Sequence, residues 1–229
     1  MACDDNEAAA RYRPTMTDDP FSPDTLPLFP LGSVLFPGGL LPLQVFEVRY
    51  LDMIGRCHRA GQPFGVVALA QGHEVRRPGA AEEQLHAVGT LARITRLEQA
   101  QPGLLLIECR GEQRFRIEQA SQLKHGLWVA TFSLLPPDPA VSVPEHLRHA
   151  ADALRRIHDG LRTNGSALAL PPADAADYGD CAWVANRWCE LLPLPLATRQ
   201  QLMALDNPLL RLELAADLLA RAGINAGSA

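Results

Sequence analysis

The stretch LPLFPLGSVLFPGGLLPLQVFEVRY, residues Leu26–Tyr50, decides how the rest of the chain is organised. From Leu26 to Phe46 it carries no charge, which is nearly the length of a membrane-spanning helix. It is not such a helix, because residues that break helices occur throughout it: Pro27, Pro30, Gly32, Pro37, Gly38, Gly39 and Pro42. An apolar run interrupted in this way predicts short buried strands joined by tight turns.

The composition limits the classes of protein to which the chain can belong. Of the 229 residues 47% are hydrophobic, so the chain can form one large domain or two small ones with a sizeable core. Its net charge of -5 disfavours a general binder of nucleic-acid backbones. The five cysteines are widely spaced without a Cys-x-x-Cys pair, which argues against a disulfide framework and a zinc ribbon. Because no apolar leader opens the chain and no uninterrupted run suits a membrane helix, we expect a cytoplasmic protein.

After the opening stretch the pattern predicts one helix and several strands. Residues 47–60 predict a helix that Gly61 ends, because Tyr50, Leu51 and Ile54 repeat at helical spacing. The charged segment 73–84 predicts an exposed loop, long enough to be functional. A long strand is predicted at 85–97, and shorter strands at 64–70, 104–109, 114–118 and 127–135, with a turn or bulge at Gly111. Short strands with frequent turns favour a closed or semi-closed antiparallel sheet.

At Pro136–Pro139 the pattern changes from strand to helix. We expect helices at about 142–162 and 174–192, a short one near 198, and a last one between Asn207 and Gly223. Two pairs resemble capping boxes, Ser142 with Glu145 and Thr198 with Gln201. The predicted organisation is an α+β fold: a disordered arm over residues 1–25, a β-rich domain over 26–136, and a bundle of about four helices over 140–224.

Several fragments of the chain carry a family pattern in order: Leu26–Leu31, Val34–Gly38, Leu41–Leu43, Phe46–Tyr50, Val88–Ile94, Gly111 and Arg114–Ile117. With them the chain resembles the N-terminal, substrate-binding domain of the Lon proteases (the LON domain). The resemblance implies a PUA-like antiparallel β pseudo-barrel with one packed helix, followed by helices. It also implies a polypeptide ligand. We expect a stand-alone member without the ATPase and peptidase domains of Lon, and therefore a monomer or homodimer rather than the ring of full-length Lon.

The residues offer little that predicts catalysis. Lys124 is the only lysine and follows Leu123, so the sequence has no phosphate-binding loop of the glycine-lysine type. Ser121 lies one helical turn before Lys124, but the pair falls in a polar segment where an exposed lysine stays protonated. His146 and His149 have a chelating spacing, yet a solvated helix face is the simpler interpretation. We therefore predict no enzymatic activity, no metal and no cofactor.

The predicted function is a non-catalytic module that binds polypeptide or a partner protein, and that acts as an adaptor in protein quality control. A sheet edge or groove would hold an extended apolar segment by strand addition, although the same apolar residues also suit a core. Arg49 and Arg114 are interpreted either as buried partners of carboxylates or as charges on the rim of this groove. The alternatives are a small hydrolase with a site at the domain junction, and RNA binding through the barrel. The candidate binding residues are Phe36, Pro37, Gly38, Leu40, Arg49, Tyr50 and Arg114.

Overall fold

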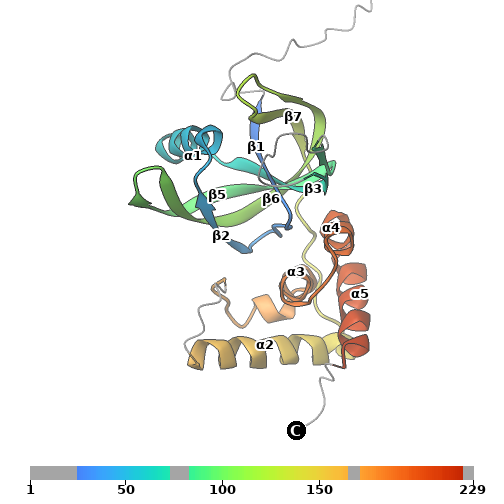
Figure 1. Cartoon of the computed structure of the whole chain (residues 1–229). Coiled ribbons are helices and arrows are strands. Elements are labelled where there is room, and N and C mark those ends of the chain that lie inside the picture. The colour runs from blue at the N-terminus through green and yellow to red at the C-terminus, as the bar shows by residue number, and fades with distance from the viewer. Residues whose placement is uncertain (1–24, 73–82, 165–170, 224–229) are drawn as a thin grey trace, which may run out of the picture.

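The computed structural model describes residues 25–72, 83–164 and 171–223 of the chain. A β-rich part lies above a layer of helices, and the two are joined by the segment that follows the last strand (Figure 1). The predicted arm lies outside the described residues except for Thr25, and so does most of the predicted loop at 73–84.

The strands of the β-rich part pair in a ring. β1 pairs in parallel with β3 and antiparallel with β7, and the remaining antiparallel pairs run from β3 through β5 and β6 back to β7. β2 and the short β4 attach to this ring at its edges. Every residue of β1 is buried, as expected of a strand with neighbours on both sides. The strands are Leu26–Leu31 (β1), Leu40–Val45 (β2), Phe64–Gln71 (β3), Gln84–Leu85 (β4), Val88–Gln101 (β5), Leu104–Gln122 (β6) and Trp128–Leu134 (β7).

The strands predicted at 104–109 and 114–118 are in fact one strand, β6, of 19 residues. The ladder with β5 shifts register where Gly111 lies, so this glycine marks a bulge and not a turn. A Cβ at Gly111 would stand 2.2 Å from the main-chain oxygen of Phe36. Only glycine allows this approach, which brings the 38–39 turn against β6 through two main-chain hydrogen bonds: Gly38 N to Gly111 O at 2.8 Å, and Gly111 N to Gly39 O at 2.9 Å.

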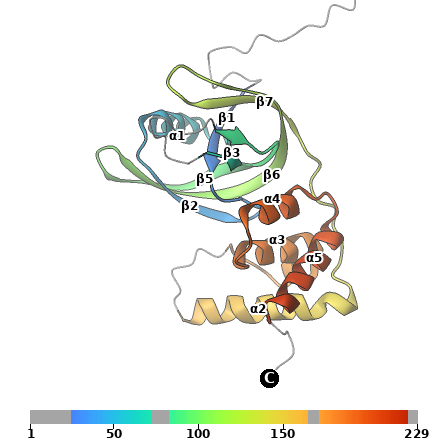
Figure 2. The ribbon, with the colours of Figure 1, turned by 45° about the vertical axis from the view of Figure 1, so that its right-hand side comes forward.

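The predicted helix after the opening stretch is α1, Val48–Ala60. Gly61 ends it in the left-handed conformation with φ of 62°. The buried face of α1 packs on one end of the β-rich part (Figure 2). Its core contacts form a cluster with Phe29, Phe64 and the inward side chains of β2.

The C-terminal part forms the predicted set of four helices, with two short 3-10 turns before α2 and α3. The side chain of Asn207 caps α5 by accepting from the amides of Leu209 and Leu210 at 3.0 and 3.2 Å, as predicted. The helical elements are Glu145–Leu147 (η1), Arg148–Thr163 (α2), Asp177–Gly179 (η2), Cys181–Leu191 (α3), Leu196–Ala204 (α4) and Pro208–Arg221 (α5).

Both predicted capping boxes are wrong. Ser142 forms an isolated β-bridge with Asp180 and lies before the helix, which begins at Arg148 without a side-chain cap. Thr198 and Gln201 lie inside α4, since that helix begins at Leu196. The prediction failed because a Ser-x-x-Glu spacing also occurs where a tertiary bridge uses the main chain.

The two parts share a continuous core. Phe36, in the segment before β2, and Val88 of β5 belong to the same buried cluster as the inward side chains of all four helices. A buried ionic group crosses the same junction: Asp138 accepts from Arg114 of β6 and from Arg211 of α5. Whether the two parts fold as separate domains stays a prediction, but their contact is a packed interior.

Candidate functional site

The strand β2 offers an open edge. Within the described residues β6 is its only strand partner, with Leu40 opposite Arg110 and Val45 opposite Leu105. The hydrogen bond from Gly111 N to Gly39 O makes the Leu40–Arg110 pair one of the non-hydrogen-bonded kind. Because the two kinds alternate, the main-chain groups of Leu40, Pro42 and Gln44 are directed away from β6.

The side chains of β2 agree with this geometry. Pro42 has no N–H to donate, and at an outward position it leaves the ladder with β6 intact. The side chains of Pro42 and Gln44 are exposed, whereas Val45 is buried. An edge strand with free outward acceptors and donors is the element that strand-addition binding uses.

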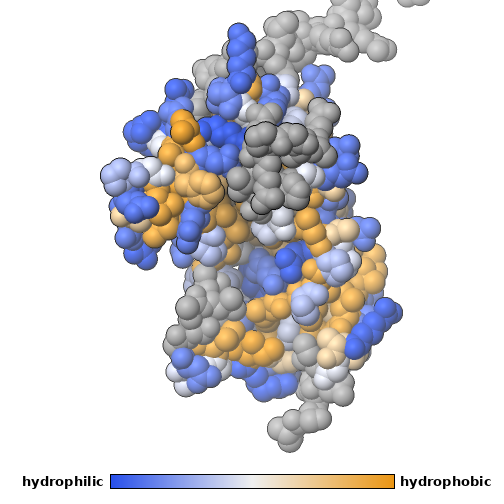
Figure 3. Space-filling model, viewed as in Figure 1, coloured by the Kyte–Doolittle hydropathy of each residue, from blue (hydrophilic) through white to orange (hydrophobic). Residues whose placement is uncertain are grey.

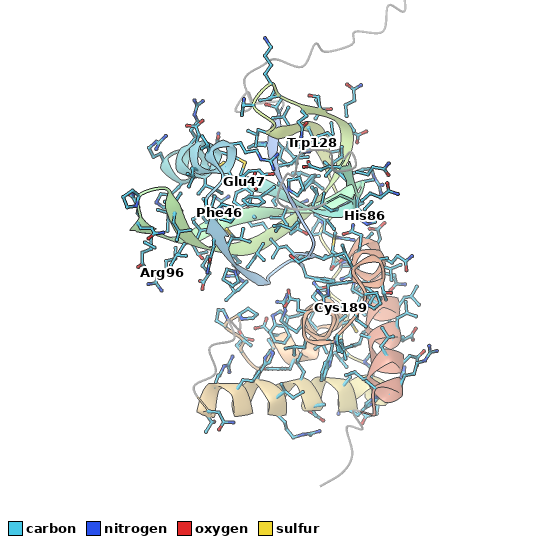
Figure 4. All side chains as sticks on the ribbon, in the orientation of Figure 1. Phe46, Glu47, His86, Arg96, Trp128 and Cys189 are labelled. Atoms are coloured by element: carbon cyan, nitrogen blue, oxygen red, sulfur yellow. The ribbon has the colours of Figure 1, made fainter. Side chains whose placement is uncertain are left out.

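A hollow of about 180 Å³ lies beside this edge, towards α1; we call it the α1-side hollow. Its floor includes Tyr50, which is 3% exposed and stacks on Phe29 with ring centroids 4.1 Å apart. Phe46, on its wall, is 54% exposed (Figure 4). Hydrophobic surface is visible on this side of the β-rich part (Figure 3). The hollow is lined by Phe29, Leu31, Pro42, Leu43, Gln44, Val45, Phe46, Glu47 and Tyr50.

A second hollow, of about 220 Å³, lies at the other end of the edge, between β2 and the helices; we call it the α3-side hollow. Pro42 lines both hollows, so together they flank the length of β2. The β-rich part supplies apolar walls, and the helices supply charged and polar groups. The lining residues are Ser33, Val34, Leu35, Leu40, Leu41, Pro42, His158, Pro171, Arg187, Glu190, Leu191 and Arg199.

An ion pair of α3 forms one wall of the α3-side hollow. Two nitrogens of Arg187 each lie 2.8 Å from a carboxylate oxygen of Glu190, and Arg187 also donates to Pro37 O at 3.0 Å. Burial raises the pKa of the Glu190 carboxyl to about 7, although the neighbouring Arg187 guanidinium favours the charged form. A Cβ at Gly39 would stand 2.1 Å from Glu190 Oε1, so this turn is where the helices meet the β-rich part.

His158 of α2 lies at the back of the same hollow with 0% exposure. Its Nδ1 is 3.0 Å from the hydroxyl oxygen of Tyr178. Burial lowers the pKa of the imidazole, and the nearby Arg162 and Arg187 lower it further. His158 is therefore a neutral ring near physiological pH.

A third hollow, of about 470 Å³, lies between β6, the 136–138 segment and α3; we call it the junction hollow. It contains the predicted residues Pro37, Gly38 and Arg114. No serine, threonine, cysteine or histidine lines it, so its described walls offer no hydroxyl, thiol or imidazole nucleophile for the hydrolase alternative. Of its two carboxylates, Asp138 is paired with Arg114 and Arg211, and Glu112 is paired with Arg93.

The cysteines that the structure describes do not supply a reactive thiol either. The four described cysteines, Cys57, Cys109, Cys181 and Cys189, are free and buried. Burial raises the pKa of the Cys57 and Cys109 thiols to about 12, which leaves almost no thiolate at neutral pH. In the described ranges no group of three or more histidine, cysteine, aspartate or glutamate side chains is arranged to hold a metal ion.

The structure separates the predicted binding residues. Phe36 is 0% exposed and belongs to the core, so its side chain cannot line a groove. Tyr50 and Leu40 line the α1-side and α3-side hollows, respectively. Pro37 and Gly38 line the junction hollow, where their main-chain atoms are close to Arg187.

Both predicted arginines are buried partners and not rim charges. Arg49 is 8% exposed; it pairs with Glu47 at 2.9 Å and donates to Gly126 O at 2.7 Å. Arg114 is 3% exposed and donates to the main-chain oxygens of Met203 and Leu205, besides its carboxylate partners. Both arginines therefore hold segments of the fold together.

Sequence reasoning missed two groups of residues at these hollows. The first is Phe46, which lines the α1-side hollow and is 54% exposed. Its exposure was predictable, since period two along β2 turns Val45 inward and Phe46 outward. The second is the set His158, Arg187, Glu190 and Arg199, which comes from three helices; no spacing in the sequence brings them together.

The described strands and helices define an α+β protein in which a ring of mostly antiparallel strands packs on a four-helix layer. The model of the ATP-dependent protease La (LON) substrate-binding domain matches residues 25–221, and the chain belongs to that family. In the part of the chain that the structure describes, none of the helices is both long and apolar enough to cross a membrane.

Solved structures agree with the family. A Lon N-terminal domain protein from Xanthomonas campestris is 33% identical, covers 84% of this chain and 97% of its own, and superposes with a TM-score of 0.64. The N-terminal domain of Mycobacterium avium complex Lon protease has a TM-score of 0.55 at 15% identity, which shows the fold alone.

Complete Lon proteases match over a small part of their length. Lon protease 2 of Myxococcus xanthus is 38% identical over 101 residues, which are 44% of this chain and 12% of that protein. Lon protease 4 of Sorangium cellulosum is 28% identical over 197 residues, or 86% of this chain and 24% of that protein. The chain thus corresponds to less than a quarter of these relatives' length.

Proposed function

We propose that this protein is a non-catalytic module that binds extended polypeptide by strand addition to β2. The observation that carries the proposal is the open β2 edge, whose outward main-chain groups lie between the α1-side and α3-side hollows. Strand addition obtains affinity from main-chain hydrogen bonds and specificity from pockets that receive alternate side chains. The name of the family, a substrate-binding domain, supports polypeptide as the ligand class.

The exposed apolar residues suit this ligand. Phe46, which directly follows β2, and Val48, the first residue of α1, are both exposed, and Phe46 lines the α1-side hollow beside the edge. An unfolded segment exposes apolar side chains that a folded protein buries, so it would gain from contact with both. A fully folded partner would present few such groups with a free main chain beside them.

A role as an adaptor in protein quality control is a finer part of the same proposal. The absence of a phosphate-binding lysine from these 229 residues, together with inert buried thiols, supports binding without catalysis. Such a module would present captured segments to another protein. The hydrolase and RNA alternatives stay predictions, and no described contact favours either.

The test uses a fluorescently labelled, permanently unfolded polypeptide and fluorescence anisotropy. We expect saturable binding that survives moderate salt, because main-chain and apolar contacts are screened little. Gln44→Pro removes one outward N–H of β2 and leaves the ladder with β6 intact, so it should weaken binding severalfold. Gln44→Ala is the matched control, since it changes the side chain and keeps the N–H.

A second pair of variants tests the apolar contact. Phe46→Ser should weaken binding, whereas Leu134→Ser should not, although Leu134 is similarly exposed at 51%. Each variant is first checked for an unchanged denaturation midpoint. Equal binding by Gln44→Pro and Gln44→Ala would refute strand addition at β2, and no binding by the wild type at high micromolar protein would refute the module itself.

A further inference from the structure

The α3-side hollow is lined by residues with buried nitrogen atoms that have no hydrogen-bond partner among the described residues. These atoms are His158 Nε2, Arg187 Nη1 and Arg199 Nε. His158 and Arg187 are 0% and 1% exposed, and all three residues line the hollow. Buried polar atoms in folded proteins are nearly always satisfied, so three unpartnered nitrogens in residues that line one hollow favour a ligand that accepts hydrogen bonds.

The contact with the Tyr178 hydroxyl bears on which ring nitrogen of His158 carries the proton. If this hydroxyl donates to Nδ1 at 3.0 Å, the proton of the neutral ring resides on Nε2. Nε2 is then a donor, like the two arginine nitrogens. The described donors therefore agree in kind.

The residues that line the hollow carry more positive than negative charge. Arg187 and Arg199 contribute two positive charges, and Glu190 contributes the one carboxylate among the lining residues. Because burial raises the pKa of Glu190, its negative charge is also easily lost near neutral pH. Donors with excess positive charge favour an anion.

The β2 edge and the apolar residues that line the hollow indicate which kind of anion fits it. Leu40, Leu41 and Pro42 of β2 line it, so a strand added to the β2 edge would run into it. Val34 and Leu191 provide apolar surface beside the charged wall. A chain end offers both parts of this chemistry: an α-carboxylate and one last apolar side chain.

We infer that the α3-side hollow binds the C-terminal α-carboxylate of a polypeptide whose last residues pair with β2. Arg199, His158 and Arg187 would donate to the carboxylate, and the last side chain would lie against Val34 and Leu191. This inference rests on the proposed function and makes it specific: the module prefers free C-terminal ends to internal segments. Capture of a terminal carboxylate beside an added strand combines two known modes of peptide recognition.

The test compares two short labelled peptides of alternating threonine and valine that end in leucine, one with a free carboxylate and one with an amide. We expect the wild type to bind the acid at least about tenfold more tightly, as charge-assisted hydrogen bonds contribute more than neutral ones. Arg199→Met should remove most of this preference. Arg96→Met is the matched control, because Arg96 is 74% exposed on the β5–β6 hairpin, away from α3 (Figure 4).

A variant that binds the acid peptide more tightly gives a result that misfolding cannot produce. At about pH 8, Glu190→Gln removes the negative charge that opposes a bound carboxylate, so the acid should bind more tightly and the amide should not. Equal affinity of the wild type for acid and amide would overturn the subsite and leave the proposed function standing. Failure of both peptides and of the unfolded polypeptide to bind would overturn the proposed function itself.

Discussion

Asp138 pairs with two buried arginines, Arg114 and Arg211, at the junction of the β-rich part and the helices. It lies 2.7 and 3.1 Å from two nitrogens of Arg211, and 3.1 Å from Arg114. The side chains of these arginines are 1% and 3% exposed. Asp138→Ala leaves both charges in a nearly dry environment, and breaking a buried pair in this way costs roughly 3–5 kcal/mol.

The structure places the expected loss near the lower end of that range. Arg114 keeps a second carboxylate, Asp206, at 3.2 Å, and Arg211 keeps the oxygen of Asn186 at 3.0 Å. We expect Asp138→Ala to lower the free energy of unfolding by about 3 kcal/mol. Since small proteins are stable by roughly 5–15 kcal/mol, the loss is large enough to measure accurately.

Urea denaturation followed by tryptophan fluorescence measures this change as a shift of the midpoint at constant slope. Asp206→Ala is the control, because the Asp206 side chain is 76% exposed and an exposed pair contributes less than about 1 kcal/mol. Arg211→Met added to Asp138→Ala should recover part of the stability, as it removes one unpaired charge. A loss below about 1 kcal/mol for Asp138→Ala would refute the reasoning.

Three further predictions concern single residues. Gly111→Ala should destabilise by about 1–3 kcal/mol in urea, because its Cβ would meet the main-chain oxygen of Phe36 at 2.2 Å; an unchanged midpoint would contradict this. Gly160→Ala in α2, with no atom within 4 Å, should instead stabilise by about 0.5–1 kcal/mol, and a loss of stability would argue against an open site. The folded-state pKa of Glu190 is raised from 4.5 to about 7, so its protonation stabilises the fold at low pH, and that contribution is lost as pH rises through this window. The stability of wild type relative to Glu190→Gln should therefore fall between about pH 4.5 and 7, and a constant difference would be inconsistent with the raised pKa.

The order of the elements was predictable because local rules decide it. Prolines and glycines between Leu26 and Phe46 exclude a long helix, and the apolar residues that remain must be buried as strands. Gly61 and Asn207 mark the ends of helices through their own conformation or side chain, so both were found from the sequence. The capping boxes were not, since their spacing has the same form whether or not the helix begins there.

The candidate site was predictable only along β2. Alternation in Leu40–Val45 indicates which side chains face outward, and Tyr50 and Leu40 do line the two hollows that flank the edge. Phe36 was misplaced because the sequence does not show that a helical layer covers the turn after it. Apolar residues of a groove and of a core have the same pattern until their neighbours are known.

The sequence by itself determined the family, the succession of strands and helices, and the apolar opening stretch. Only the tertiary structure decided that Arg114 and Arg211 meet at Asp138, and that His158, Arg187, Glu190 and Arg199 surround one hollow beside β2. The reason is physical. Propensity and periodicity act over a few neighbouring residues, whereas burial, charge and unmet hydrogen bonds arise between segments more than a hundred residues apart, such as Pro37 and Arg187 with a separation of 150.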